Sequence, residues 1–225
     1  MTRLQKNTIP IFLLSSFLLI FLVFYFIRKQ KKQPIRFLPY YGQKIFSNKQ
    51  DTVYHTIPNF EFIDQSGNKV TQETVKNKIY VTDYFFTTCH TICPIMSNQM
   101  ERVANTFKGN ADIMFLSHTV NPEDDSVSVL NEYAIKHHAN KSQWLFLTGN
   151  KKALYSLARK GYLLNAEEGD GGEDDFIHTQ NFALIDKEKH IRGFYDGTDS
   201  TEVNRLIIDI QLLLDEYSWK KQLAN

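Results

Sequence analysis

The chemistry of this chain starts from its two cysteines, Cys89 and Cys93, which three residues separate. Thiols this close in sequence favour a shared role over two unrelated buried side chains. As thiolates they are soft ligands for Cu(I), Zn(II) or an iron–sulfur cluster, and without metal they can form a disulfide. A purely structural role is less favoured, because the pair should flank an exposed turn.

The elements around the pair predict a strand that delivers it to a helix. Residues 78–86 are β-branched and aromatic, as a buried central strand should be. After Pro94, apolar residues recur at helical spacing as far as Gly109. We expect Pro94 at the first helical position, where its missing N–H is not needed. A helix N-terminus favours negative charge, so both thiols should ionise more easily than usual.

The rest of the chain alternates strands and helices, which predicts an α/β fold with a mostly parallel sheet covered on both faces. The order is that of a thioredoxin-like fold with an N-terminal strand extension. Further strands are expected at 58–64, 112–117 and 143–147, a hairpin at 176–186 and 190–196, and helices from 121, at 151–160 and at 201–217.

The spacing of the cysteines narrows the choice of site. No further cysteine exists to complete a Cys₄ or Cys₃His zinc site, and a haem attachment needs C-x-x-C-H. The motif is also one residue longer than the C-x-x-C of thioredoxin-type oxidoreductases. Two cysteines and one histidine fit a copper preference better.

Seven histidines could supply the third ligand. His178 is favoured, because it precedes a predicted strand in a segment that faces the cysteine turn in a thioredoxin-like fold. Thioredoxins usually carry a cis-proline there, and this chain has no proline after Pro122. His118, which follows a strand end, is the reserve candidate. The ring of His90 should point away from the turn, and the remaining histidines should be surface or turn residues: His55, His137, His138 and His190.

An apolar run at residues 9–27 predicts a transmembrane helix, since 19 residues span roughly 28 Å. A cleaved signal peptide is the alternative, but no small-residue cleavage site follows the run. We therefore expect a membrane anchor with basic flanks at 1–33, a tether at 34–54 and a thioredoxin-like copper-binding domain at 55–220.

Charge is uneven along the chain. Six of its 26 basic residues and none of its 25 acids lie in residues 1–33, so residues 34–225 carry an excess of acids. This argues against nucleic acid as a partner. Six acids and three glycines at 166–175 predict a loop, which could guide a basic partner, weakly collect metal, or simply solubilise the chain.

Three segments in order resemble the Sco/SenC family: TTCHTICP at 87–94, NPEDD at 121–125 and IHT at 177–179 before a strand. The resemblance covers approximately residues 55–217. It implies a copper chaperone or thiol reductant that assists assembly of the CuA centre in cytochrome c oxidase subunit II. It also implies that Cys89, Cys93 and His178 bind Cu(I) or Cu(II), on a domain held by one N-terminal helix.

Three positions depart from the family pattern without removing a ligand. His90 stands where many members have proline, Asn121 where the acidic segment usually begins with aspartate, and Ile177 where an aspartate commonly precedes the ligand histidine. Asp125 is kept.

The resemblance also bears on location. Four basic residues follow the apolar run and two precede it, so the positive-inside rule alone would place the domain in the cytoplasm. The family implies an inner-membrane protein whose domain faces the periplasm or an equivalent compartment, and we favour that placement.

Three functions therefore stand side by side. The first is a metallochaperone that passes copper by ligand exchange and can also reduce a partner disulfide with Cys89 and Cys93 as a redox-active pair. The second is a metal-independent thiol–disulfide oxidoreductase or peroxidase that uses the same pair. The third is a membrane-tethered interaction module.

Overall fold

The computed structural model describes residues 19–22, 36–46, 52–164, 172, 177 and 179–224. The chain divides into two compact units, Met1–Arg36 and Phe37–Asn225. In the first unit, residues 19–22 are helical and exposed. Within the described residues, no helix is both long and apolar enough to cross a membrane. Most of the run at 9–27 lies outside them.

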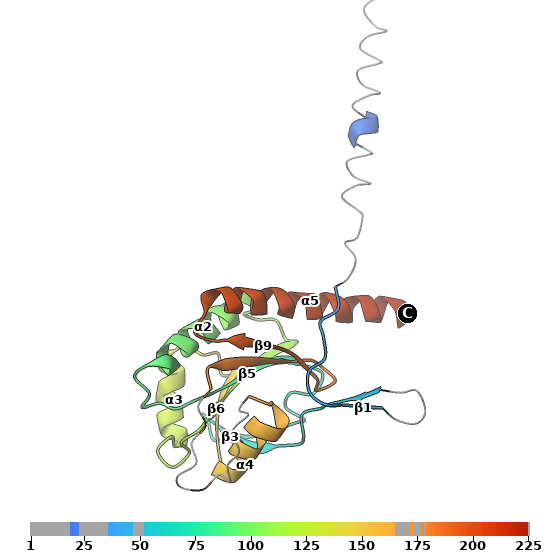
Figure 1. Ribbon diagram of the computed structural model, residues 1–225. Coiled ribbons are helices and arrows are strands. Elements are labelled where there is room, and N and C mark those ends of the chain that lie inside the picture. Colours follow the sequence, from blue (N-terminus) through green and yellow to red (C-terminus); the bar gives the residue numbers. More distant parts are fainter. Residues whose placement is uncertain are drawn as a thin grey trace, which may run out of the picture. The chain divides into compact units, whose positions relative to one another are not determined.

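The second unit is built on a seven-stranded mixed sheet with the strand order β4-β3-β7-β6-β5-β8-β9 (Figure 1). Its strands are β3 (Glu61–Asp64), β4 (Lys69–Thr71), β5 (Ile79–Phe85), β6 (Ile113–Thr119), β7 (Trp144–Thr148), β8 (Asn181–Ile185) and β9 (Ile191–Asp196). The α/β expectation is confirmed, but a mostly parallel sheet is wrong. Strands β5, β6 and β7 pair in parallel, whereas the hairpins β3–β4 and β8–β9 join them antiparallel on either side.

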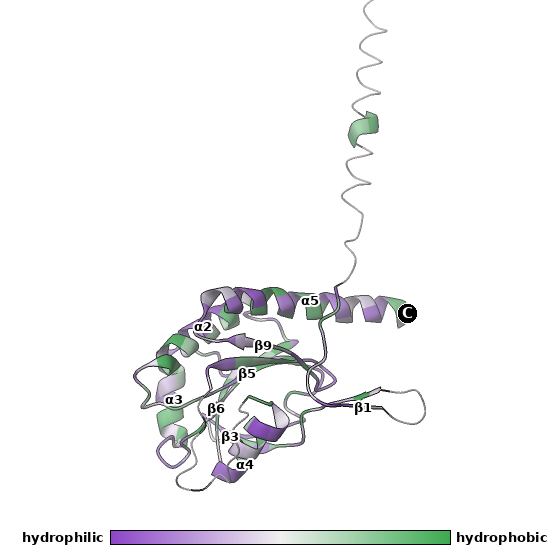
Figure 2. Cartoon of the chain, in the orientation of Figure 1, coloured by the Kyte–Doolittle hydropathy of each residue, from purple (hydrophilic) through white to green (hydrophobic). Residues whose placement is uncertain are grey.

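Four helices accompany the sheet: α2 (Ile92–Thr106), α3 (Val127–Lys136), α4 (Lys151–Ser156) and α5 (Ser200–Ala224). Ser126 and Asn150 cap α3 and α4 by accepting hydrogen bonds from backbone N–H groups three residues on. A π-helical turn, η1 (Leu157–Gly161), continues α4. Helix α5 alternates hydrophobic and hydrophilic residues along its length (Figure 2), as the sequence predicts for a closing helix.

The sheet separates two hydrophobic cores. On one face, which we call the first core, Val81 and Phe85 of β5 pack with side chains from α2, α3 and α5. On the other face, the second core, Tyr80 and Tyr84 of the same strand pack with residues of α4 and of the segment before β3. Consecutive residues of β5 thus alternate between the cores, and every residue of the strand is buried, as expected for a central strand.

Part of the range expected as a tether packs on the domain. Leu38 is buried, and the Arg192 guanidinium donates to the carbonyl oxygens of Leu38 at 2.7 Å and Pro39 at 3.2 Å. The N–H of Tyr41 donates to the carbonyl oxygen of Ile191 at 2.9 Å. Strands β1 (Lys44–Phe46) and β2 (Thr52–Tyr54) form a separate antiparallel pair.

Candidate metal centre

The cysteine loop begins where β5 ends. The carbonyl oxygen of Phe85 still accepts a sheet-like hydrogen bond from the N–H of Val120, at 2.8 Å. The chain then turns, and the N–H of Cys89 donates to the carbonyl oxygen of Phe86 at 3.2 Å. The loop therefore lies at the carboxyl end of the parallel strands, where ligand sites gather in α/β sheets.

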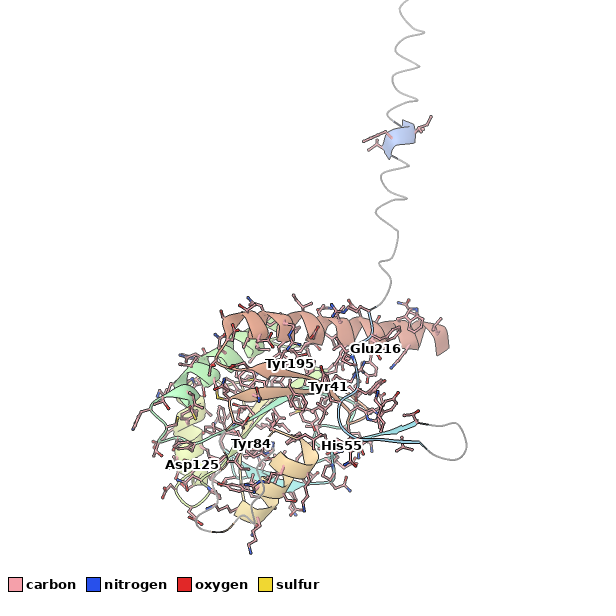
Figure 3. All side chains as sticks on the ribbon, in the orientation of Figure 1. Tyr41, His55, Tyr84, Asp125, Tyr195 and Glu216 are labelled. Carbon is pink, nitrogen blue, oxygen red and sulfur yellow. The ribbon has the colours of Figure 1, made fainter. Side chains whose placement is uncertain are left out.

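Asp125 fixes this loop from the neighbouring connection. It is buried, and its carboxylate accepts hydrogen bonds from the N–H of Thr87 at 3.3 Å, from the Thr87 hydroxyl and from the Thr119 hydroxyl. Figure 3 shows Asp125 at the end of the domain where α3 begins. The kept aspartate of the NPEDD segment is thus a positioning residue, because it holds Thr87, two positions before the first cysteine.

Helix α2 begins at Ile92, so Cys93 is its second residue and Pro94 its third. The expectation of Pro94 at the first helical position is wrong by two residues. The missing N–H of Pro94 removes no hydrogen bond from the helix at this third position either, because the first four N–H groups of a helix have no partner within it. One of these free donors is used here: the N–H of Cys93 donates to the sulfur of Cys89, at 3.4 Å.

The turn that the cysteines flank is exposed at Thr88, His90 and Thr91, as expected, but both cysteine side chains are buried. Cys89 is 8% exposed and Cys93 is 3% exposed, and both belong to the first core. Their neighbours there include Phe85, Met96 and Tyr133. The Tyr133 hydroxyl is hydrogen-bonded to Ser97 of α2, at 2.8 Å. The pair therefore sits at the edge of a packed core, and Cys89 is the sulfur nearer to solvent.

The two thiols differ in acidity. Burial raises the pKa of Cys89, but hydrogen bonds from Cys93 and Thr91 to its sulfur outweigh burial and lower the pKa to about 7. Burial raises the pKa of Cys93 to about 12, with the hydrogen bond to Cys89 as a further cause. The expectation that both thiols ionise easily is therefore correct for Cys89 and wrong for Cys93.

Asp83 is an acidic residue near the site that the sequence reasoning missed. It lies in β5, is 1% exposed, and has one carboxylate oxygen without a hydrogen-bond partner among the described residues. Burial raises its pKa to about 7, and its charge helps to raise the pKa of Cys93 and of Tyr133. The sequence could have pointed to Asp83, because an acidic residue is unusual in the middle of a strand that is predicted to be buried.

The reserve ligand His118 is excluded by the face of the sheet on which it lies. It belongs to β6 beside Tyr84 and stacks on that ring, with centroids 5.0 Å apart. Phe62 and Tyr162 also contact it, and all three rings belong to the second core, across the sheet from the cysteines. Burial lowers its pKa to about 3.

Five other histidines lie among the described residues, and one of them, His138, is exposed as expected, with its Nδ1 3.0 Å from a carboxylate oxygen of Glu101. His90 is exposed. His55 and His190 make backbone hydrogen bonds, to the carbonyl oxygens of Gly161 and His55 respectively, as residues beside turns should. His137 corrects the expectation of a surface role, because it is 3% exposed and packs against Tyr133, with ring centroids 4.6 Å apart.

His178 lies outside the described residues, as does the acidic segment 166–175 apart from Gly172. Its neighbour Ile177 is buried in the second core, and the hydroxyl of Thr179 accepts a hydrogen bond from the N–H of Asn181 at 3.2 Å. Among the described residues, no three histidine, cysteine or acidic side chains are grouped to hold a metal ion. All three ligands, Cys89, Cys93 and His178, therefore stay predictions.

Comparisons with known proteins complete the description of the site. A SCO1 protein homolog of Bacillus subtilis is 29% identical over 172 residues, which are 76% of this chain and 86% of that protein. A putative copper-binding protein of Stutzerimonas stutzeri is 27% identical over 141 residues, 61% of this chain and 67% of that protein.

Solved structures are similar over the same domain. A SCO1/SenC family lipoprotein from Bacillus anthracis has a TM-score of 0.62 and 26% identity, covering 71% of this chain and 95% of that chain. BsSco, a member of the Sco family of cytochrome c oxidase assembly proteins with an identified disulfide switch, has a TM-score of 0.60 and 27% identity, covering 71% and 93%. The SCO1/SenC family model matches residues 48–213, which contain both cysteines and His178, and on that match this chain belongs to the SCO1/SenC family.

Proposed function

We propose that this chain binds one copper ion through Cys89, Cys93 and His178 and serves in the assembly of the copper centre of cytochrome c oxidase. The observation that carries the proposal is the direct contact within the cysteine pair, in which the N–H of Cys93 donates to the sulfur of Cys89 at 3.4 Å. Two sulfurs held this way at the carboxyl end of a sheet form a preorganised pair of soft donors.

The protonation of the pair suits capture of a soft ion. With a pKa of about 7, Cys89 is substantially a thiolate at neutral pH and can make the first bond. Cys93 keeps its proton until the metal displaces it, because ligation requires the thiolate. Binding should therefore release at least one proton for each ion bound.

The register of the sheet supports His178 as the third ligand. Strand β8 runs antiparallel to β5 and pairs Thr82 with Ala183, so the chain that leads into β8 arrives from the carboxyl end of β5. Residue 178 is three positions before Asn181, the first residue of β8, and three residues reach at most about 10 Å. The cysteine loop follows the same end of β5. His118, the alternative imidazole, lies in the second core.

Ligand exchange is the transfer step that this donor set allows. A partner's thiolate attacks the bound ion and forms one new bond while one bond to Cys89, Cys93 or His178 breaks, and the process repeats until the ion has left. The relatives support this role: one is named as copper-binding and another as a member of a family of cytochrome c oxidase assembly proteins. Subunit II of the oxidase is the proposed acceptor.

The same proposal includes a membrane anchor. The apolar run at 9–27 is long enough to span a bilayer, and basic residues flank it. We place the anchor at 1–33 and the copper-binding domain at 55–220, facing the periplasm or an equivalent compartment. A relative of similar fold is described as a lipoprotein. In a protease-protection experiment on spheroplasts, external protease should digest the domain, and a domain shielded from protease would contradict the placement.

An anaerobic titration of the full chain with Cu(I), against a competing chromogenic chelator, tests the function. The wild type should bind one ion tightly. Cys89→Ser and Cys93→Ser should abolish competition with the chelator, and His178→Ala should weaken it. His90→Ala, which removes an exposed imidazole between the cysteines, is the matched control. Unchanged binding in either cysteine variant would refute the copper site.

Thiol reduction is a second candidate, favoured by the unequal acidity of the pair. A nucleophilic Cys89 and a protonated Cys93 are suited to successive steps of exchange. The Cys89 thiolate would attack a partner disulfide and form a mixed disulfide, and the Cys93 sulfur would then displace the partner's second thiolate. Two electrons pass to the partner, and Cys89 and Cys93 become a disulfide. Reductase activity that persists in His178→Ala would separate this candidate from copper binding.

A further inference from the structure

We propose that the end of the domain formed by Phe37, Trp219, Lys220, Lys221 and Leu223 docks onto the surface of a lipid bilayer and so holds the cysteine pair on the side of the domain away from the membrane. We call these five residues the docking end. The proposal rests on the membrane anchor within the proposed function.

The docking end combines the side chains that suit a membrane interface. Phe37 is 53% exposed and Leu223 is 66% exposed, and Phe37 meets the ring of Trp219 edge to face, with centroids 5.7 Å apart. Lys220 and Lys221 are exposed in the last turns of α5, and the Lys220 ammonium also pairs with Glu216 at 2.7 Å. Tryptophan favours the level of the lipid headgroups, and lysine stems lie along apolar surface while their charges reach water or anionic lipid. The occupant that fits this mixture is an anionic bilayer surface.

Chain length keeps this end close to the proposed anchor. The apolar run ends at Ile27, and nine residues separate it from Phe37, the first residue of the domain unit. A fully extended chain of that length reaches at most about 35 Å. Four of the intervening residues are Arg28, Lys29, Lys31 and Lys32, which anionic headgroups attract. An anchored domain therefore presents Phe37, and Trp219 in contact with it, near the bilayer.

The docking end lies at the opposite end of β5 from the cysteines. The hydroxyl of Tyr217 in α5 accepts from the N–H of Lys187, and the Lys187 ammonium pairs with Asp112 at 2.9 Å. The carbonyl oxygen of Asp112 accepts from the N–H of Ile79, the first residue of β5, at 2.8 Å. The cysteine loop follows the last residue of this strand, whose seven residues extend about 20 Å.

Figure 3 labels one residue near each of these two parts of the domain. Glu216, one turn before Lys220 in α5, and Asp125, which holds the cysteine loop, are labelled at opposite ends of the domain. Docking would therefore turn the metal centre outward. The centre would meet the water-exposed domain of a partner rather than a group within the bilayer.

Two tryptophans make the proposal testable by fluorescence. Trp144 is 1% exposed in the first core, whereas Trp219 belongs to the docking end. The full chain is reconstituted into vesicles of phosphatidylcholine and phosphatidylglycerol, with or without bromine on the acyl chains. We expect brominated lipid to quench the wild-type emission. In the variant Trp219→Phe, Trp144 is the remaining tryptophan, and its emission should be the same in brominated and in ordinary vesicles.

Acidic substitutions at the docking end supply a matched comparison. The double variant Lys221→Glu and Leu223→Glu should lose most of the quenching, whereas Lys152→Glu, an exposed lysine of α4, should keep it. Equal emission of the wild type in brominated and ordinary vesicles would overturn docking, and so would full quenching in the double variant.

Flotation of the same vesicles on a density gradient separates this proposal from the anchor. A chain that floats without quenching overturns docking alone. A chain that does not float overturns the anchor and docking together. Neither result tests copper binding, which the Cu(I) titration measures independently.

Discussion

Asp125 holds Thr87 at two points, by accepting hydrogen bonds from its backbone N–H and from its hydroxyl. The same carboxylate accepts from the hydroxyl of Thr119, the last residue of β6. One buried side chain thereby ties the cysteine loop after β5 to the end of the neighbouring strand. The link therefore holds the loop that carries Cys89, one of the proposed ligands, although Asp125 is not itself proposed as a ligand.

Asp125→Ala should destabilise the protein and loosen the metal site together. It leaves the buried Thr119 hydroxyl and the half-buried Thr87 N–H without an acceptor, and a buried group left in this way costs about 1–3 kcal/mol. Urea unfolding should show the loss in the free energy of unfolding, and a Cu(I) titration should show weaker binding. Asp124→Ala, which removes an exposed neighbouring carboxylate, should change neither measurement appreciably. Equal effects of the two substitutions would contradict the positioning role.

The unequal acidity of the cysteines should appear in their reactivity. In the reduced, copper-free protein, Cys89 should react with iodoacetamide first, and its rate should rise through about pH 7 as the thiolate forms. Cys93, with its pKa raised to about 12, should stay largely unmodified below pH 9. Mass spectrometry of the two modified positions after short reaction times measures both rates. Equal modification at pH 7 would show that the predicted difference is absent.

Arg192 should be among the most sensitive single positions for stability. Its guanidinium is 1% exposed, pairs with Asp186 at 2.9 Å and Glu216 at 3.0 Å, and also binds the carbonyl oxygens of residues 38 and 39. Arg192→Met leaves the buried carboxylate of Asp186 without its cation and leaves Glu216 paired with Lys220 alone, which costs about 3–5 kcal/mol. Thermal or urea unfolding measures this cost.

A surface pair provides the comparison for Arg192. Lys69 and Glu61 are joined at 2.8 Å, but both side chains are about 60% exposed. Lys69→Met should therefore cost less than about 1 kcal/mol. A loss in Arg192→Met no larger than this would contradict the structural importance of the buried network.

His118 should make the copper-free protein sensitive to acid. Burial lowers its pKa from 6.5 to about 3, so the folded protein keeps it neutral while the unfolded chain binds a proton below about pH 6.5. Its contribution to stability is complete above that pH and falls by about 1.4 kcal/mol per pH unit towards pH 3.

His118→Phe should flatten this part of the pH dependence of unfolding, measured by urea titration between pH 4 and pH 7. The carboxylates contribute equally to both proteins and cancel in the comparison. His90→Asn, an exposed substitution, should keep the wild-type slope. A slope in His118→Phe as steep as that of the wild type would show that the buried ring does not govern it.

The sequence predicted the elements that position the site because their patterns are local. The β-branched and aromatic residues of β5 are typical of a buried central strand, and the structure buries each of its seven residues. The helical spacing after Pro94 likewise predicted α2. Boundaries were less accurate: α5 continues to Ala224, beyond the expected end at 217.

Features that depend on long-range packing could not be predicted in this way. The pairing of His118 with Tyr84 decides that its ring enters the second core, and a strand register is not visible in one sequence. The cysteine loop is held through Thr87 by Asp125, which lies 38 positions later in the sequence. His137 is buried because α3 ends against Trp144, a contact that the polar residues around it conceal.

X-ray absorption spectroscopy of the Cu(I)-loaded full chain tests the central claim most directly, because it counts the sulfur and nitrogen atoms bound to copper. Two sulfurs and one imidazole nitrogen are expected in the wild type and in His118→Phe, and two sulfurs without that nitrogen in His178→Ala. A wild-type site with a single sulfur, or an imidazole signal that survives in His178→Ala, would contradict the account.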